Sequence, residues 1–258
     1  SQWISGQQDL VIGGGGAAFV EVADGATFTT ATSNQIVLAR DEGSSADVLI
    51  TGPGSAWNES AAQIVVAGMG DATLRLQDGA TIQAPTLSVR PRGLLLGDGN
   101  LNTTVLTNFG VVRPGADNAP GALQITGSLR QVGVPPGGPA DAGAIDLDLF
   151  GANPGEFDTV SVTGDLELAG RLRVTLAPGF DPDPSALAGL PLVTASSNFE
   201  ASRFDVALMP GLSQNKFLSL GYQTAARSPD GRASTTVALT VNDLTADIAL
   251  DVQDPTTA

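Results

Sequence analysis

Apolar and polar residues alternate in short runs along most of the chain. Residues 20–22 and 74–76 alternate over three positions, and residues 144–149 alternate over a longer stretch. Glycine, asparagine and proline separate these runs, as they do around residues 93–97 and 110–115. The pattern predicts many short β-strands, each with one apolar face, joined by tight turns.

One unit of this pattern is written twice without a gap. Its positions are Ser1, Trp3, Leu10, Gly14, Gly16, Asp24, Gly25, Ala26 and Thr27, which recur as Ser55, Trp57, Ile64, Gly68, Gly70, Asp78, Gly79, Ala80 and Thr81. A similar apolar segment at residues 36–39 lies between the two copies, so the period is roughly 26 residues. A strand-turn-strand unit of this size cannot bury its apolar face alone, so neighbouring units must stack. The sequence therefore predicts an all-β fold, a parallel β-solenoid.

Two kinds of repeated residue have a structural interpretation. Asp24-Gly25 and Asp78-Gly79 have the composition of tight turns between strands. Trp3 and Trp57 occupy one repeat position, which Phe28 and Ile82 hold in other units, so we expect a stacked apolar ladder inside the solenoid. The alternative for the tryptophans is an exposed platform on which a carbohydrate stacks.

Charge and composition exclude several classes of function. The net charge is −15, with one lysine and 11 arginines, which argues against nucleic acid as a partner. The chain has no histidine and no cysteine, so it can build neither Ser-His-Asp nor Cys-His catalysis, nor an imidazole metal site. No apolar run reaches the roughly 18 residues needed to span a bilayer, so we expect no membrane insertion.

Carboxylates are the remaining groups for chemistry. Asp146 and Asp148 alternate with apolar neighbours and are read as the solvated face of a strand, although paired acids could cleave a polysaccharide. Asp181 and Asp183 flank a proline, and an ordinary loop is the simpler interpretation, with a calcium site as the alternative. No acid stands out, so we expect a protein that is not an enzyme and has no cofactor other than this calcium.

The spacing divides the chain into three parts. Residues 1–131 form the repeat solenoid, residues 132–177 continue it after a segment rich in proline and glycine, and residues 178–258 form a less regular β-rich cap or assembly region. A strand around Ile248, Ala249 and Leu250 is a candidate for pairing with a neighbouring subunit. The chain also begins inside a repeat, and an open first unit could be covered by another copy.

Three segments carry a family resemblance. Residues 55–81, residues 110–129 and residues 157–172 resemble the repeats of autotransporter passengers and of the related repeat proteins of bacteria with PEP-CTERM export systems. The resemblance implies a right-handed parallel β-helix that is exported to the cell surface or beyond. It also implies an adhesive or structural role.

Together these observations predict a non-enzymatic, extracellular β-solenoid that assembles head to tail into a homo-oligomer or filament. Stacking of ends or addition of a strand would join the copies. A surface glycan is the other partner considered. The alternative function is a polysaccharide-binding or polysaccharide-degrading β-helix that uses surface carboxylates.

Overall fold

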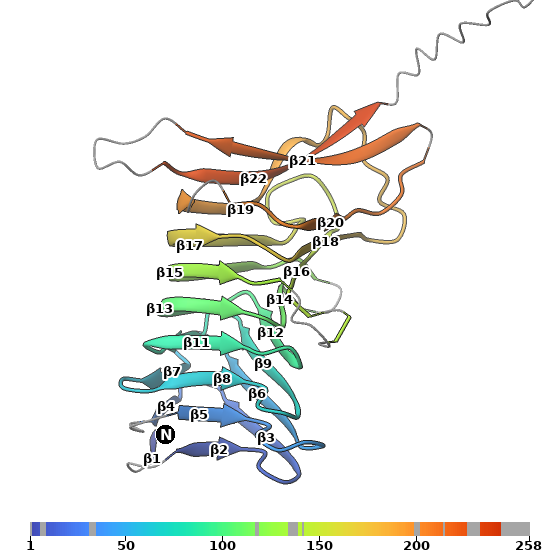
Figure 1. The fold of residues 1–258 in the computed structure, drawn as a ribbon. Helices are drawn as coiled ribbons and strands as arrows, with labels where there is room; N and C mark the ends of the chain where they lie inside the picture. Colours follow the sequence, from blue (N-terminus) through green and yellow to red (C-terminus); the bar gives the residue numbers. More distant parts are fainter. Residues whose placement is uncertain are drawn as a thin grey trace, which may run out of the picture.

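The fold was analysed in a computed structural model of the chain. It describes residues 2–5, 9–30, 35–116, 119–133, 139–140, 142–198, 202–213, 215–225 and 233–243. Within these ranges the secondary structure consists of β-strands, isolated bridges, turns and bends, and none of it is helical. The all-β prediction is therefore confirmed for the described residues. Figure 1 shows the strands lying one above another along a single axis.

The described strands form two sheets, of which the first begins with β1 and the second with β3. The second sheet has eight strands in the described part of the chain. Its order is β20 (Val206–Leu208), β18 (Arg171–Leu176), β16 (Ala144–Leu149), β14 (Val111–Pro114), β12 (Gly93–Gly97), β9 (Asp71–Gln77), β6 (Ser45–Thr51) and β3 (Ala17–Val22). All of these neighbouring strands are parallel. Parallel neighbours need a crossover connection. Between two neighbouring strands of the second sheet, the chain crosses over by forming one or two strands of the first sheet.

The first sheet has 14 strands among the described residues. Its main path is β1 (Gln2–Ser5), β4 (Thr27–Thr30), β7 (Ala56–Glu59), β10 (Thr81–Gln83), β13 (Asn100–Asn108), β15 (Ala122–Gln131), β17 (Thr159–Glu167), β19 (Ala188–Asn198), β22 (Thr235–Asp243) and β21 (Lys216–Thr224). A side branch consists of β2 (Leu10–Ile12), β5 (Gln35–Leu38), β8 (Gln63–Val66) and β11 (Thr86–Val89), and it joins the main path at β13.

Strand β13 changes the cross-section of the stack. Its first part pairs with β10 and its last part pairs with β11, and a register shift lies in its pairing with β15 between Asn102 and Val105. Before β13 each layer of the stack has three short strands, such as β4, β5 and β6. From β13 to β20 each layer has one long strand in the first sheet and one strand in the second.

The core consists of aliphatic and aromatic side chains that stack from layer to layer. One ladder in register is Ile36, Ile64, Leu87, Leu106, Leu129 and Leu166. Each of these side chains is at most 1% exposed. Burial of one such side chain stabilises the fold by about 1.5–3 kcal/mol before the entropy of ordering is counted. The alternation read from the sequence therefore places the apolar positions inside.

The last layers depart from parallel pairing. β19 is parallel to β17 on one side, but it is antiparallel to β22 on the other, and β22 is antiparallel to β21. The hydrogen bond from the Ala225 N–H to the Ser234 oxygen (3.0 Å) links the facing ends of β21 and β22. Antiparallel neighbours such as β21 and β22 do not need the crossover that parallel neighbours need. The first sheet is thus mixed, and the C-terminal strands are less regular than the layers before them.

Candidate functional site: a groove on the second sheet

The tryptophan position of the repeat forms a ladder in the first sheet. Trp3 lies opposite Phe28, Phe28 opposite Trp57, and Trp57 opposite Ile82. Two steps along this ladder lead from Trp3 to Trp57, which is one full copy of the unit seen in the sequence. Trp57 has no exposed surface, its ring centroid is 5.3 Å from that of Phe28, and its indole N–H donates to the Thr30 hydroxyl. A buried ring cannot serve as a carbohydrate platform, so the alternative role for Trp57 is wrong.

The two Asp-Gly pairs form the turns that lead back to the first sheet. Asp24 and Gly25 have φ angles of 56° and 72°, and Asp78 and Gly79 have φ angles of 55° and 74°. The Ala26 N–H donates to the carbonyl three residues earlier at 3.0 Å, which closes the first turn. Positive φ at both central residues is the pattern of a type I′ turn, which Asp-Gly favours. These residues shape the backbone.

Asp181 and Asp183 converge on an ammonium group. The Lys216 Nζ lies 3.1 Å from Asp181 and 3.5 Å from Asp183, and the Ser213 hydroxyl also donates to Asp181. Hydrogen bonds from Ser213 and Lys216 hold the pKa of Asp181 below its usual range. A lysine side chain therefore already supplies positive charge at the place where sequence reasoning considered calcium. Nowhere in the described residues do three or more acidic, histidine or cysteine side chains gather as metal ligands.

The other acid candidates, Asp146 and Asp148, make different contacts. Asp146 forms an ion pair with Arg173 at 2.8 Å, and its side chain is only 15% exposed, so it is less solvated than the sequence predicted. The Asp148 N–H donates to a different acid, Asp158, which the sequence analysis did not single out. The candidate assembly residues Ile248, Ala249 and Leu250 lie outside the described residues.

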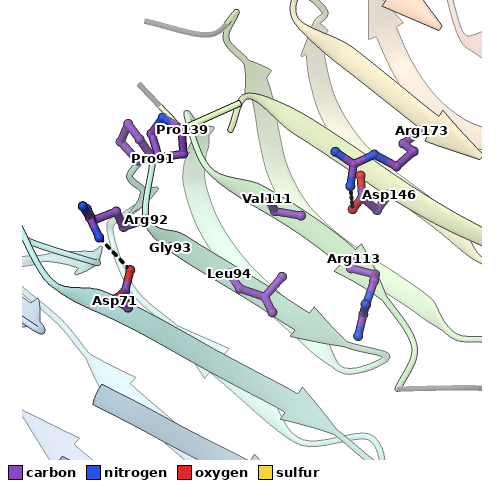
Figure 2. A pocket seen from close by; sticks show the side chains of 10 residues that line it. All are labelled: Asp71, Pro91, Arg92, Gly93, Leu94, Val111, Arg113, Pro139, Asp146 and Arg173. Carbon is purple, nitrogen blue, oxygen red and sulfur yellow. Dashed lines mark hydrogen bonds and ion pairs between the residues drawn. The ribbon is translucent and has the colours of Figure 1, made fainter. Parts of the chain in front are cut away.

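A groove of about 760 Å³ lies on the outer face of the second sheet (Figure 2). Its ten lining residues come from β9, β12, β14, β16 and β18 and from the segments that lead into β12 and β16. The groove therefore crosses five consecutive strands. A second hollow of about 330 Å³ continues it, because Pro91, Arg92 and Pro139 line both.

Arginine side chains recur at alternate strands across this face. Arg75 on β9 and Arg113 on β14 both lie opposite Leu96 of β12. Val112 of β14 lies opposite Ile145 of β16, so the next residues, Arg113 and Asp146, are also neighbours across these two strands. Asp146 in turn lies opposite Arg173 of β18. One column across the sheet thus carries arginine on β9, β14 and β18. Two strand spacings, about 10 Å, separate successive arginines in the column.

Two ion pairs orient arginines that line the groove. The Arg92 Nη1 lies 3.2 Å from the Asp71 carboxylate, and the Arg173 Nη1 lies 2.8 Å from the Asp146 carboxylate. The side chains of Arg92 and Arg173 remain 53% and 33% exposed. Figure 2 shows the apolar side chain of Leu94 between these ion pairs. The groove therefore combines oriented cationic groups with an apolar floor.

The face from β9 to β18 carries both arginines and aspartates. Among the described residues, five arginines lie on the face from β9 to β18, namely Arg75, Arg92, Arg113, Arg171 and Arg173. The same strands carry three outward aspartates, Asp71, Asp146 and Asp148. Arg92 lies just before β12, and Arg75 forms an ion pair with Asp47 of the neighbouring strand β6 at 3.1 Å. Arginines and aspartates therefore pair across this face.

Sequence reasoning missed these arginines. Arg75, Arg113 and Arg173 are unevenly spaced along the chain, so no constant period relates them. Only the register of the strands between them shows that they share a column. The proline-rich segment offered a partial signal, because its composition predicts a break in strand pairing, and its Pro139 lines the groove.

Comparison with known proteins adds no relative. No family model matches the chain, and no match was found among curated proteins. The resemblance to autotransporter passengers therefore stays a prediction. In the part of the chain that the structure describes, no helix has the length and apolar character needed to cross a membrane.

Proposed function

We propose that this chain is a right-handed parallel β-helix that serves outside the bacterial cell as a structural and adhesive element and not as an enzyme. The observation that carries the proposal is the stacking of parallel strands in both sheets, from β3 to β20 and from β1 to β19. Such a stack buries continuous ladders and presents a long, regular surface. The location outside the cell comes from the resemblance of residues 55–81.

End-to-end assembly into a filament is the second part of the proposal. Among the described residues, β3 and β20 are the outer strands of the second sheet, so each has one edge without a partner strand. Phe19 on β3 and Val206 and Leu208 on β20 are exposed. Unpaired edges with apolar side chains favour addition of a strand from another copy. A contact between different ends of two copies propagates into a filament unless it closes into a ring.

Negative-stain electron microscopy of the purified chain tests this proposal. We expect regular fibres, and we expect Val206→Asp combined with Leu208→Asp to abolish them, because two carboxylates at the β20 edge repel an approaching strand. Ala122→Asp combined with Gln124→Asp adds the same two carboxylates at exposed positions of the inner strand β15 and should leave the fibres intact. A wild-type chain that stays monomeric at all concentrations would contradict the assembly.

A further inference from the structure

We propose that the outer face of the first sheet binds a neutral polysaccharide, through a hollow lined by hydroxyl groups on β17, β19 and β22. The inference rests on the proposed adhesive function and names a partner and a site for it. Three observations carry it: the chemistry of the hollow, a column of uncharged side chains that leads to it, and the net charge of the chain.

The hollow has a volume of about 280 Å³ and is lined mainly by alcohol side chains. Seven of its nine lining residues are serine or threonine, and the other two are Val162 and Ala195. Ser161, Thr194 and Thr236 lie opposite one another on the three strands. The volume is just below the range of about 300–1,000 Å³ that is typical of drug-sized ligands, so it suits a single sugar unit.

The hydroxyls of the hollow make few hydrogen bonds within the described structure. Thr194 donates to the Ser161 hydroxyl at 3.5 Å, and the Gly127 N–H donates to the Thr163 hydroxyl at 3.1 Å. The first of these bonds is long and therefore weak. A hydroxyl both donates and accepts, so it matches the hydroxyl of a sugar in either role.

A column of uncharged side chains crosses the first sheet and ends at the hollow. In the register of the strands it runs from Thr27 on β4 through Thr81, Gln124, Ser161 and Thr194 to Thr236 on β22. The column crosses eight strands, and none of its members is charged. Seven strand spacings amount to about 34 Å. The column therefore offers hydrogen-bonding groups to a polymer that extends beyond the hollow.

A second uncharged column runs beside the first on β4, β7, β10, β13 and β15. Its members lie two residues farther along each strand and so face the same side of the sheet. They are Thr29, Asn58, Gln83, Asn102 and Thr126. Among the described residues that line the hollow, none is aromatic, so we expect affinity to come from several weak polar contacts along the columns and not from stacking.

Charge decides between the possible partners of this face. The net charge of −15 repels a polyanion, and the two columns carry no cation that would pair with one. A second copy lying side by side would bring two such charges together along their whole length. An apolar surface would leave the hydroxyl and amide groups without hydrogen-bond partners. A neutral polymer rich in hydroxyls avoids each of these costs.

Affinity electrophoresis in gels that contain dextran, galactomannan or a soluble β-glucan tests the inference, with polygalacturonate as the charged comparison. We expect at least one neutral polymer to retard the intact chain, and polygalacturonate not to retard it. Thr194→Val combined with Thr236→Val should weaken binding about tenfold, because valine has nearly the shape of threonine but lacks the hydroxyl. Thr73→Val combined with Thr175→Val is the matched control, since it removes two hydroxyls from outward positions of the second sheet.

Several results would overturn the inference. One is that no neutral polymer retards a chain whose fold is verified by circular dichroism, and another is that the control pair loses as much affinity. Equal retardation by polygalacturonate would show that the face does not select for neutral sugars. Dimers that form without any polysaccharide and disappear in Thr194→Val with Thr236→Val, seen by analytical ultracentrifugation, would identify a second copy as the occupant. The fibres are tested separately, by electron microscopy of the β20 variants.

Discussion

A buried carboxylate holds together three segments in the middle of the stack. Asp158 has no exposed surface, and its two oxygens accept hydrogen bonds from the Gly121 N–H at 2.8 Å and the Asp148 N–H at 2.9 Å. Its own N–H donates to the Asp148 carbonyl at 2.9 Å. These bonds join the segment before β17 to β16 and to the residue before β15. Burial raises the pKa of Asp158 to about 7, although the N–H donors of Asp148 and Gly121 oppose the rise.

This pKa predicts how stability depends on pH. Because the pKa is about 7 in the folded chain against 3.8 ordinarily, the folded state retains a proton that the unfolded state releases. The stability contributed by this group is complete below about pH 4 and is lost as the pH rises from there through about 7. We expect a loss on the order of 4 kcal/mol between pH 4 and pH 8, measured by urea denaturation.

Asp158→Asn provides the comparison, because an amide does not titrate. The unfolding free energy of the wild type minus that of the variant should decrease as the pH rises from 4 to 8, because only the wild type loses the contribution of Asp158. All other carboxylates are common to both proteins and cancel in this difference. A difference that stays constant over this range would show that Asp158 titrates normally.

Gly127 sits where two strands approach too closely for a side chain. Its φ is 129°, and a Cβ built on it would lie 1.6 Å from the Thr103 carbonyl oxygen of β13. We expect Gly127→Ala to destabilise the fold by about 3 kcal/mol through strain and overpacking. Gly211→Ala is the matched control, since a Cβ there meets nothing within 4 Å. Thermal unfolding of both variants measures the effect, and equal unfolding temperatures would contradict it.

At the scale of elements, β13 is the strand on which the architecture depends. Leu101 and Leu106 lie on either side of its register shift, and both are completely buried. The single strand β13 therefore extends two columns of core residues, which in the earlier layers belong to separate strands. The stack keeps its core through this change because the ladders through Leu101 and Leu106 run on into β15.

The capping strands β21 and β22 should differ in their protection from hydrogen exchange. β22 pairs with both β19 and β21, whereas in the described structure β21 pairs with β22 alone. We therefore expect slow exchange along β22 and fast exchange at those β21 amides that face away from it. Exchange measured by mass spectrometry or NMR tests this. Uniform slow exchange in β21 would mean that a further strand covers its edge.

The first layers were well predicted from the sequence because local and global signals agree there. Trp3, Phe28, Trp57 and Ile82 could be aligned by their spacing alone, since the layers between them have nearly equal lengths. After β13 the spacing between stacked partners varies, as between Ile125 and Val162, so periodicity no longer gives the register. Half of the ten residues that line the groove come after β13. Its arginines, and the partners of Asp158, could not be predicted without the pairing of distant strands.

At the scale of the whole molecule, the acidic net charge and the local arginines act in opposite directions. The net charge of −15 repels anions at a distance and repels other parts of the same chain. Local arginines act within about one Debye length, roughly 8 Å at physiological salt. Moderate salt should therefore relieve the general repulsion while leaving contacts inside the groove only partly screened.

This balance predicts the response of stability to salt. We expect the unfolding temperature to rise by a few degrees as NaCl increases from about 10 to 150 mM, because screening reduces self-repulsion in the folded chain. CaCl₂ at equal ionic strength should give the same rise, since the Lys216 ammonium already pairs with both Asp181 and Asp183. Differential scanning calorimetry measures both. A larger effect of calcium that disappears in Asp181→Asn would instead identify a calcium site.

Because the sequence repeats a two-layer unit, the length of the stack can change by whole units. Duplicating that unit upstream of β9 would add about 10 Å, two strand spacings, without altering the strands that form the groove or the cap. The distance from the groove to the far end of the rod is then set by copy number. Natural or engineered variants could thus project the same contact surface farther from its point of origin by a single in-frame duplication.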